Sequence, residues 1–363
     1  MSAAHVTVDL DDSDGLLEAD RGGLLRFAAM AGAQVRATAA AVDEGALSSF
    51  AGGPRPRSLI WVAPRGAAES AGAILNAALG GVAGEPLVLA AEPPPWVGAL
   101  DAMVVAGDDP GDPTLVSAAA TAVRRGARVV VAAPYEGPLR EATAGRAAVV
   151  EPRVWVPDEF GLSRYLAVGL AAATAVDPSL SLTDLAVLAD DLDAEALRNS
   201  AGRGVFTNPA KALAERITGR SAVLAGDCAA TVALARHAAA VLLRLAGVPV
   251  AAVALSDAVA ASRGGALASR CGNTVDALFH DEEFDGPLHV RPRVMTLSLE
   301  SERSVLAAKL SGLGDFELLG VDDLGGGLAG APPVPAVAGR LEQLAVLAVR
   351  LEMAAVYLRL AGG

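Results

Sequence analysis

The chain of 363 residues carries a formal net charge of −13, and 53% of its residues are hydrophobic although only 4% are aromatic. Its length predicts about two domains, and its negative charge argues against nucleic acid or an anionic membrane as a partner. Because aromatic residues are scarce, Ala, Val and Leu must build the core, which favours helices packed closely on parallel strands. Cys228 and Cys271 make no disulfide framework and suit a reducing cytoplasm.

The first half of the chain alternates helices with short apolar strands. After a helical segment at 16–42, we predict strands at 58–63, 86–90, 101–106, 127–133 and 147–150, and helices at 67–79, 114–125, 137–143 and 161–176. Continuous apolar strands separated by helices are typical of a parallel sheet that is covered on both faces.

The same pattern restarts after a polar, mostly helical stretch at 178–205. Here we predict helices at 208–217, 229–245, 301–313 and 336–360, and strands at 221–225, 250–255, 294–299 and 316–321, with an irregular stretch after 255. The long apolar runs are interrupted by Arg and Glu, and four aspartates between residues 9 and 14 make the start unlike a signal peptide. The sequence therefore predicts a duplicated α/β unit in a soluble, cytoplasmic protein.

One turn of the first half has the frame of an anion site but the opposite charge. The predicted strand 101–106 runs into Gly107-Asp108-Asp109-Pro110-Gly111-Asp112-Pro113-Thr114, and a helix follows. A strand, a glycine-containing turn and a helix N-terminus are the usual place to hold a phosphate, because free backbone N–H groups and the helix dipole point there. Three carboxylates at this acidic turn (residues 107–114) would repel a phosphate.

The tandem arrangement resembles a pair of sugar isomerase (SIS) domains. Asn208-Pro209-Ala210-Lys211 is similar to the signature that opens the second domain of the bifunctional phosphoglucose/phosphomannose isomerases, and Tyr357-Leu358 is similar to their closing helix. Within that family the chain looks closest to a divergent actinobacterial, TobH-like branch. The resemblance implies an α/β fold of two tandem SIS domains, each a parallel sheet sandwiched by helices: an N-terminal SIS domain at 1–180, a linker at 181–207, and a C-terminal SIS domain, like that of the isomerases, at 208–363.

The resemblance also implies where a sugar phosphate would bind. The family's first glycine loop falls on 63–68, where Gly66 fits but Pro64 and Ala68 replace a glycine and a serine. Its serine-rich phosphate cradle falls on the acidic turn, where Thr114 and Ser117 are the nearby hydroxyls. A family arginine corresponds loosely to Arg164. We expect Arg65, Gly66, Thr114, Ser117 and Arg164 to bind substrate, although Arg65 and Arg164 could instead pair with Asp108, Asp109 or Asp112.

The family's catalytic residues have no counterpart in this chain. Isomerisation between an aldose and a ketose needs a base that moves a proton between two carbons. The family's glutamate base falls on Leu243 or Arg244, its histidine falls in 256–260, and its terminal lysine is unmatched. Asp257, Glu69 and His237 are the substitutes that we consider, and His237 suits a core or interface position better than a catalytic one.

Two further motifs could each be a binding site or an ordinary part of the surface. Cys271-Gly272-Asn273-Thr274 imitates a phosphate turn but lacks the preceding strand. The residues from His280 to His289, rich in Asp and Glu, could suggest a metal site, but an acidic surface loop explains them more simply because no helix fixes their spacing. We therefore predict no metal and no cofactor.

Three hypotheses follow from the sequence. The first is a SIS-fold protein that binds a phosphosugar or a related carbohydrate derivative without isomerising it. The second is an active glucose-6-phosphate/mannose-6-phosphate isomerase with a rearranged site, and the third is a structural subunit without a small ligand. The long helices 229–245 and 341–360 expose more apolar surface than one domain covers, and the resemblance implies a homodimer. We expect a homodimer with neither nucleic acid nor membrane as a partner.

Overall fold

The computed structural model describes residues 7–180, 182–265, 267, 292–322 and 339–362. Contacts among these residues define two units. The first unit comprises Asp20–Ser200 and Pro335–Met353, and the second comprises Met1–Ala19, Ala201–Val334 and Ala354–Gly363, in each case for the described residues. The domain limits expected from the sequence stay a prediction.

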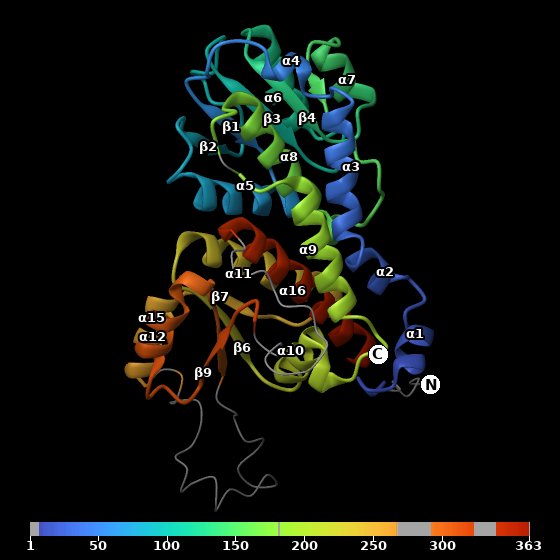
Figure 1. The fold of residues 1–363 in the computed structure, drawn as a ribbon, viewed down its shortest axis with the longest axis vertical. Helices are drawn as coiled ribbons and strands as arrows, with labels where there is room; N and C mark the ends of the chain where they lie inside the picture. The colour runs from blue at the N-terminus through green and yellow to red at the C-terminus, as the bar shows by residue number, and fades with distance from the viewer. Residues whose placement is uncertain (1–6, 181, 266, 268–291, 323–338, 363) are drawn as a thin grey trace, which may run out of the picture. The chain divides into compact units, whose positions relative to one another are not determined.

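The first unit is built on a five-stranded parallel sheet in the order β2-β1-β3-β4-β5. The strands are β1 (Leu59–Val62), β2 (Leu87–Ala90), β3 (Ala102–Ala106), β4 (Arg128–Ala132) and β5 (Ala148–Val149). Each lies where the sequence predicts a strand, because runs of Val, Ile and Ala that are buried on both faces are typical of a parallel sheet. Figure 1 shows this sheet and its helices.

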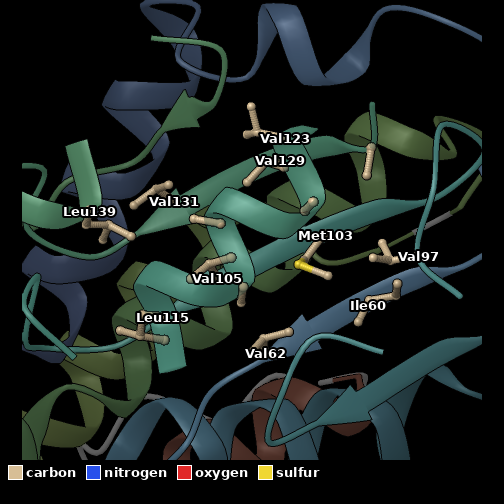
Figure 2. Close-up of a cluster of buried hydrophobic side chains, with 14 of the residues drawn as sticks. Ile60, Val62, Val97, Met103, Val105, Leu115, Val123, Val129, Val131 and Leu139 are labelled. Carbon is tan, nitrogen blue, oxygen red and sulfur yellow. The ribbon is translucent and has the colours of Figure 1, made fainter. Parts of the chain in front are cut away.

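Helices cover both faces of this sheet. Side chains of β1, β3 and β4 that alternate along each strand point to one face and pack against α6 (Pro113–Arg124). Figure 2 shows this core, in which Val105 lies near Leu115 of α6, and Ile60, Met103 and Val129 belong to the same cluster. Trp61 points to the opposite face, where its indole N–H donates to Ala68 O of α5 (Gly66–Leu79) at 2.9 Å. The helix α8 (Leu162–Val176) packs against α5 on that side.

The remaining helices of the first unit pack around these layers. They are α2 (Leu24–Ala28), α3 (Ala31–Asp43), α4 (Ser48–Ala51), α7 (Gly137–Thr143), the 3-10 helix η1 (Asp158–Phe160) and α9 (Leu185–Arg198). The helix α9, which the sequence places in the linker, packs along α3.

The second unit repeats the strand arrangement. Its parallel sheet has the order β7-β6-β8-β9, with β6 (Ala222–Gly226), β7 (Ala251–Ala254), β8 (Arg293–Leu297) and β9 (Phe316–Leu319). Its helices are α1 (Ser13–Ala19), the 3-10 helix η2 (Val205–Thr207), α10 (Pro209–Ile217), α11 (Ala229–Ala246), α12 (Leu255–Arg263) and α15 (Glu300–Leu310), and the end of α16 (Arg340–Gly362). The corners from β1 to α5 and from β6 to α11 are equivalent, so the predicted duplication is confirmed.

Two predicted segments differ from the structure. The single helix expected at 16–42 is three helices, α1, α2 and α3, and Gly23 just before α2 has a left-handed backbone with φ +66° that a continuing helix cannot adopt. The stretch after residue 255, expected to be irregular, begins with α12. It is short and Ala-rich, and its sequence carries no N-cap side chain to mark its start.

Among the described residues one helix, α11, is long and apolar enough to cross a membrane by length and composition, and 56% of it is buried. It packs against β6 and β7 in the second unit. A core helix of an α/β unit passes the same test, so this helix by itself is weak evidence for a membrane span.

A buried ion pair joins α9 to α16 within the first unit. Glu195 Oε1 accepts from Arg350 Nε at 2.7 Å, and Asn199 Nδ2 donates to the same carboxylate oxygen at 2.7 Å. Both charged side chains are almost fully buried. Burial alone would raise the pKa of Glu195, but the charge and hydrogen bonds of Arg350 outweigh it, and the pKa lies below its usual value. The pair therefore stays ionised inside the unit.

We expect Glu195→Ala to lower the free energy of unfolding by about 3–5 kcal/mol, because it removes the carboxylate that pairs with the buried Arg350. The control is Arg36→Ala, which breaks an exposed ion pair between Arg36 of α3 and Asp190 of α9, the helix that carries Glu195. This control should lower the free energy of unfolding by at most about 1 kcal/mol. Denaturant unfolding followed by circular dichroism measures both. A cost for Glu195→Ala no larger than that of Arg36→Ala would contradict the role given to the buried pair.

Candidate functional site

The strand order of the first unit fixes where a ligand can approach. In the order 2-1-3-4-5 the direction in which successive strands are added to the sheet reverses between β1 and β3. Open α/β sheets bind ligands at the carboxyl ends of the two strands that flank such a point. The loops that follow β1 and β3 are residues 63–65 and 107–112. We call the space above these two loops the crevice. At the crevice, Arg65 and Gly66 lie next to the acidic turn.

The carboxylate of Asp112 lies at the N-terminus of α6, where a bound phosphate would lie in an anion site. It is the N-cap of α6, and its Oδ1 accepts from the backbone N–H of Thr114 at 2.8 Å and of Leu115 at 3.4 Å. Its Oδ2 accepts from Arg65 Nη1 at 3.0 Å. Aspartate is a preferred N-cap because its oxygens satisfy otherwise free N–H groups. The N–H groups that would hold a phosphate are therefore already bonded.

Arg65 links the two loops of the crevice. Besides Asp112, its Nη2 lies 3.6 Å from Asp108 Oδ1 and 3.8 Å from Asp109 Oδ2. Arg65, Asp108 and Asp109 are each about half exposed, whereas Asp112 is buried. The pairing that the sequence left open for Arg65 is thus present, and it uses all three aspartates of the turn. This guanidinium is consequently engaged by protein carboxylates.

A second carboxylate lies against the glycine loop. Gly66 has a left-handed backbone with φ +69°, and a Cβ at this position would come within 2.5 Å of Asp158 Oδ2. Only glycine allows both the backbone angle and this close approach. Asp158 belongs to η1, which lies between the edge strand β5 and α8. The N-terminus of α5 therefore also faces a protein carboxylate.

Arg164 lines a cavity of about 120 Å³ beside these loops, which we call the Arg164 cavity. Its guanidinium lies 4.1 Å from the centroid of the Tyr165 ring, and its Nη1 makes a long contact of 3.5 Å to Ala132 O. The Tyr165 hydroxyl is buried and has no hydrogen-bond partner among the described residues. Burial raises the pKa of Tyr165 to about 12, so the phenol stays protonated as a donor. An unsatisfied buried polar group costs about 1–3 kcal/mol, which marks this position as unusual.

The other predicted substrate residues lie at the edge of the crevice. Thr114 is half-buried in the first turn of α6, and Ser117 is exposed one turn later. The structure thus brings Arg65 and Thr114 together around Asp112, and places Gly66 beside Asp158, which lines the same cavity as Arg164.

The substitutes for the missing base are scattered. Glu69 is exposed in the first turn of α5. Asp257 is exposed in the first turn of α12, and His237 is buried in α11, both in the second unit. Leu243, one of the two positions that match the family's base, lies exposed near the end of α11. The roles of these residues stay predictions.

Cys271-Thr274 and the residues from His280 to His289 lie outside the described residues. Within the described ranges, no group of three or more His, Cys, Asp or Glu side chains could hold a metal ion.

Sequence reasoning missed three residues of the Arg164 cavity: Trp155, Asp158 and Tyr165. Trp155 and Asp158 come from the segment between β5 and α8, and Tyr165 lies in the first turn of α8; all three are far from the acidic turn in sequence. The available signal was the stretch Trp155-Val156-Pro157-Asp158, in which an aromatic and a carboxylate flank a proline directly before an apolar helix.

The Asn-Pro-Ala-Lys signature has a packing role in the second unit. Asn208 Oδ1 accepts from Lys211 N at 3.0 Å and caps α10, and the Asn208 amide lies 3.5 Å from the Tyr357 hydroxyl. Lys211 Nζ donates to Ala201 O at 2.7 Å and lies 5.4 Å from the Tyr357 ring centroid. Burial lowers the pKa of Lys211. The two segments on which the family resemblance rests are therefore in contact with each other.

No protein-family model and no curated protein matches the sequence, but solved structures match almost the whole chain. The C-terminal domain of glucosamine-fructose-6-phosphate aminotransferase from Francisella tularensis is 14% identical with a TM-score of 0.60, over 94% of this chain and 96% of that one. Tagatose-6-phosphate ketose/aldose isomerase from Escherichia coli is 13% identical with a TM-score of 0.58, over 98% and 95%. Glucosamine-6-phosphate deaminase from Thermotoga maritima is 9% identical with a TM-score of 0.53, over 96% and 94%.

At such identities the likeness shows the fold alone. The two parallel sheets flanked by helices match these phosphosugar-handling neighbours, so the predicted α/β fold with two SIS-type units is confirmed. The structures support the SIS fold in general and do not single out the phosphoglucose/phosphomannose isomerases.

We expect Asp112→Ala to lower the free energy of unfolding by about 1–2 kcal/mol, because α6 loses its N-cap and Arg65 loses its closest partner. Asp112→Asn keeps an amide oxygen for the N–H groups of Thr114 and Leu115 and should cost less than the alanine variant. Thermal unfolding of the two variants beside the wild type measures the difference. Equal stability of all three proteins would show that the Asp112 contacts do not hold the turn.

Proposed function

We propose that the protein binds a phosphosugar or a related carbohydrate derivative in the crevice of the first unit and does not isomerise it. The neighbours of the fold include an aldose/ketose isomerase and a deaminase of sugar phosphates. In this chain the strand order assigns a ligand to the crevice between the loops after β1 and β3. The proposal combines that position with the chemistry of this chain's own residues.

The observation that carries the second part of the proposal, the absence of isomerisation, is the ion pair between Arg65 and Asp112 at the N-terminus of α6. A helix N-terminus binds a phosphate through N–H groups that have no other partner. Here a carboxylate takes those groups, and it brings a negative charge to the place where a sugar phosphate would put its own. A reaction that depends on that phosphate loses its anchor.

The proposal also rests on the missing base. General base catalysis contributes roughly a hundredfold to ten-thousandfold to such reactions, and stabilising the charge that develops on the enediolate needs donors aimed at it. Leu243 has no titratable side chain, and Asp257 and Glu69 are exposed, where water solvates a carboxylate. The alternative, an active glucose-6-phosphate/mannose-6-phosphate isomerase, would have to use one of these carboxylates.

Several finer points belong to the same proposal. We propose that the chain descends from the phosphoglucose/phosphomannose isomerases through a TobH-like branch, on the strength of the Asn208–Lys211 signature and the closing helix with Tyr357. We further propose that it acts in the cytoplasm as a homodimer, needs no cofactor or metal, and binds neither nucleic acid nor membrane.

The purified protein should not interconvert glucose 6-phosphate, mannose 6-phosphate and fructose 6-phosphate at an enzymatic rate, because the base, the histidine and the phosphate anchor are all replaced. A coupled assay for fructose 6-phosphate production tests this expectation. Robust production that Asp257→Ala or Glu69→Ala abolishes would overturn the proposal in favour of the active isomerase.

Replacing Asp108, Asp109 and Asp112 with Ser, Gly and Thr, respectively, should create or strengthen phosphosugar binding. The triple change removes three negative charges, and the threonine that replaces Asp112 keeps a hydroxyl that can still cap α6. Calorimetric titration with glucose 6-phosphate, beside circular dichroism as a control for folding, measures the gain. Unchanged titrations in a folded triple variant would remove the carboxylates as the reason for weak phosphate binding.

A further inference from the structure

The Arg164 cavity differs from the phosphate cradle beside it in what its walls offer a ligand. Polar groups come from Asp108, Asp158, Arg164 and Tyr165, and the aromatic Trp155 stands at its side. Trp155 is 73% exposed, and its ring meets Phe27 edge to face at 5.3 Å between centroids, with 82° between the planes. A small cavity with a few convergent polar groups and an exposed aromatic surface is the usual form of a binding site.

The charge of the crevice and its cavity is negative. Arg65 lies near the carboxylates of Asp108, Asp109 and Asp112, and Arg164 lines the cavity together with Asp108 and Asp158. Two positive and four negative side chains give a sum of −2 for these six residues. A bound phosphate would add to the electrostatic repulsion among these carboxylates, whereas a bound cation would reduce it. Electrostatics therefore favours a positively charged ligand group.

An independent observation on Tyr165 points to a polar ligand atom in the cavity. Tyr165 is only 1% exposed, lines the cavity, and its hydroxyl has no hydrogen-bond partner among the described residues. Buried hydroxyl groups in proteins are nearly always hydrogen-bonded, so one without a protein partner points to a ligand or water that completes it. A hydroxyl oxygen can accept from an N–H group and can donate to a sugar oxygen.

We propose that the Arg164 cavity recognises an amine-bearing carbohydrate, with the protonated amine seated between the carboxylates of Asp108 and Asp158 and the sugar ring lying on Trp155. The inference rests on the proposed function, since it names the ligand class of that same site. The ammonium group donates to the carboxylates, and the Tyr165 hydroxyl bonds to a neighbouring polar atom of the ligand. Asp158 already interacts with another group of the protein, and the ligand's amine would be an additional partner of its carboxylate.

The size of the cavity agrees with this arrangement. Its volume of about 120 Å³ is well below that of a usual drug-sized pocket, which suits one polar edge of a sugar with the ring outside. The exposed face of Trp155 supplies a flat apolar surface for that ring, and the ring of a tryptophan also attracts an ammonium group by a cation–π interaction. A phosphate on the far end of the sugar would remain in water.

The test is calorimetric titration of the full chain with three ligands that share the glucose ring: glucosamine, glucose and glucose 6-phosphate. We expect glucosamine to bind saturably and at least tenfold more tightly than glucose, with glucose 6-phosphate the weakest of the three. The fluorescence of Trp155 should change with glucosamine, and Trp155→Ala should remove the change. This ranking uses the wild-type protein and does not depend on any variant folding.

Variants then locate the site. Asp158→Asn should weaken glucosamine binding at least tenfold, and Tyr165→Phe should weaken it several-fold, because each removes one partner of the ligand and keeps the side-chain shape. The matched control is Asp190→Asn, a carboxylate of α9 that is 77% exposed on its side chain and pairs with Arg36. This control should bind glucosamine as the wild type does.

The outcomes separate this inference from the proposed function. If glucose 6-phosphate or glucose binds at least as tightly as glucosamine, the amine inference is wrong and carbohydrate binding stands. If none of the three binds, both are wrong. If glucosamine is preferred but Asp158→Asn and Tyr165→Phe bind it unchanged while remaining folded, the amine lies elsewhere and the inference is overturned.

Discussion

The contacts of Asp112 determine what the rest of the site can do. One carboxylate accepts from two backbone N–H groups of α6 and from the guanidinium of Arg65, and thereby joins the loop after β3 to the loop after β1. Because these are the loops between which an open α/β sheet holds its ligand, the protein has placed its own anion where a ligand's anion would go. The position of Arg65 follows from that contact, Asp112 adds to the negative charge of the crevice, and in the proposed function the same carboxylate replaces a phosphate anchor.

The equivalent corner of the second unit is closed in a similar way. Cys228 is the N-cap of α11, its N–H donates to Thr231 Oγ1 at 3.2 Å, and the neighbouring Asp227 accepts from Lys309 Nζ at 2.9 Å. Gly226 packs so closely on α11 that a Cβ would lie 2.4 Å from Val232 N. In both units, side chains of the protein satisfy the corner that a SIS fold can offer to an anion. The same corner of the fold is thus occupied by side chains of the protein in both units, which fits the proposal that the chain does not isomerise its ligand.

Much of the fold was predictable because it depends on local signals. Runs such as Met103-Val104-Val105 can be buried on both faces only in a parallel sheet, and Asp112-Pro113 is a cap followed by the residue that best starts a helix. The acidic turn and its pairing with Arg65 could be anticipated for the same reason. Asp158 and Tyr165 could not, since they reach the crevice through the packing of η1 and α8, and no local pattern records that Gly66 is approached by a carboxylate. The break at Gly23 was missed because the apolar pattern continues on both sides of it.

The central claim is that protein carboxylates hold the N–H groups that a SIS fold would offer to a phosphate. Its most direct test is the response of the backbone amides of Gly66, Thr114 and Leu115 to inorganic phosphate in NMR spectra of the wild-type protein. The account predicts that these resonances stay in place up to millimolar phosphate, because the amides of Thr114 and Leu115 are bonded to Asp112 and Asp158 lies against Gly66. A saturable shift of the same amides at such concentrations would show that phosphate displaces the carboxylates and would contradict the account.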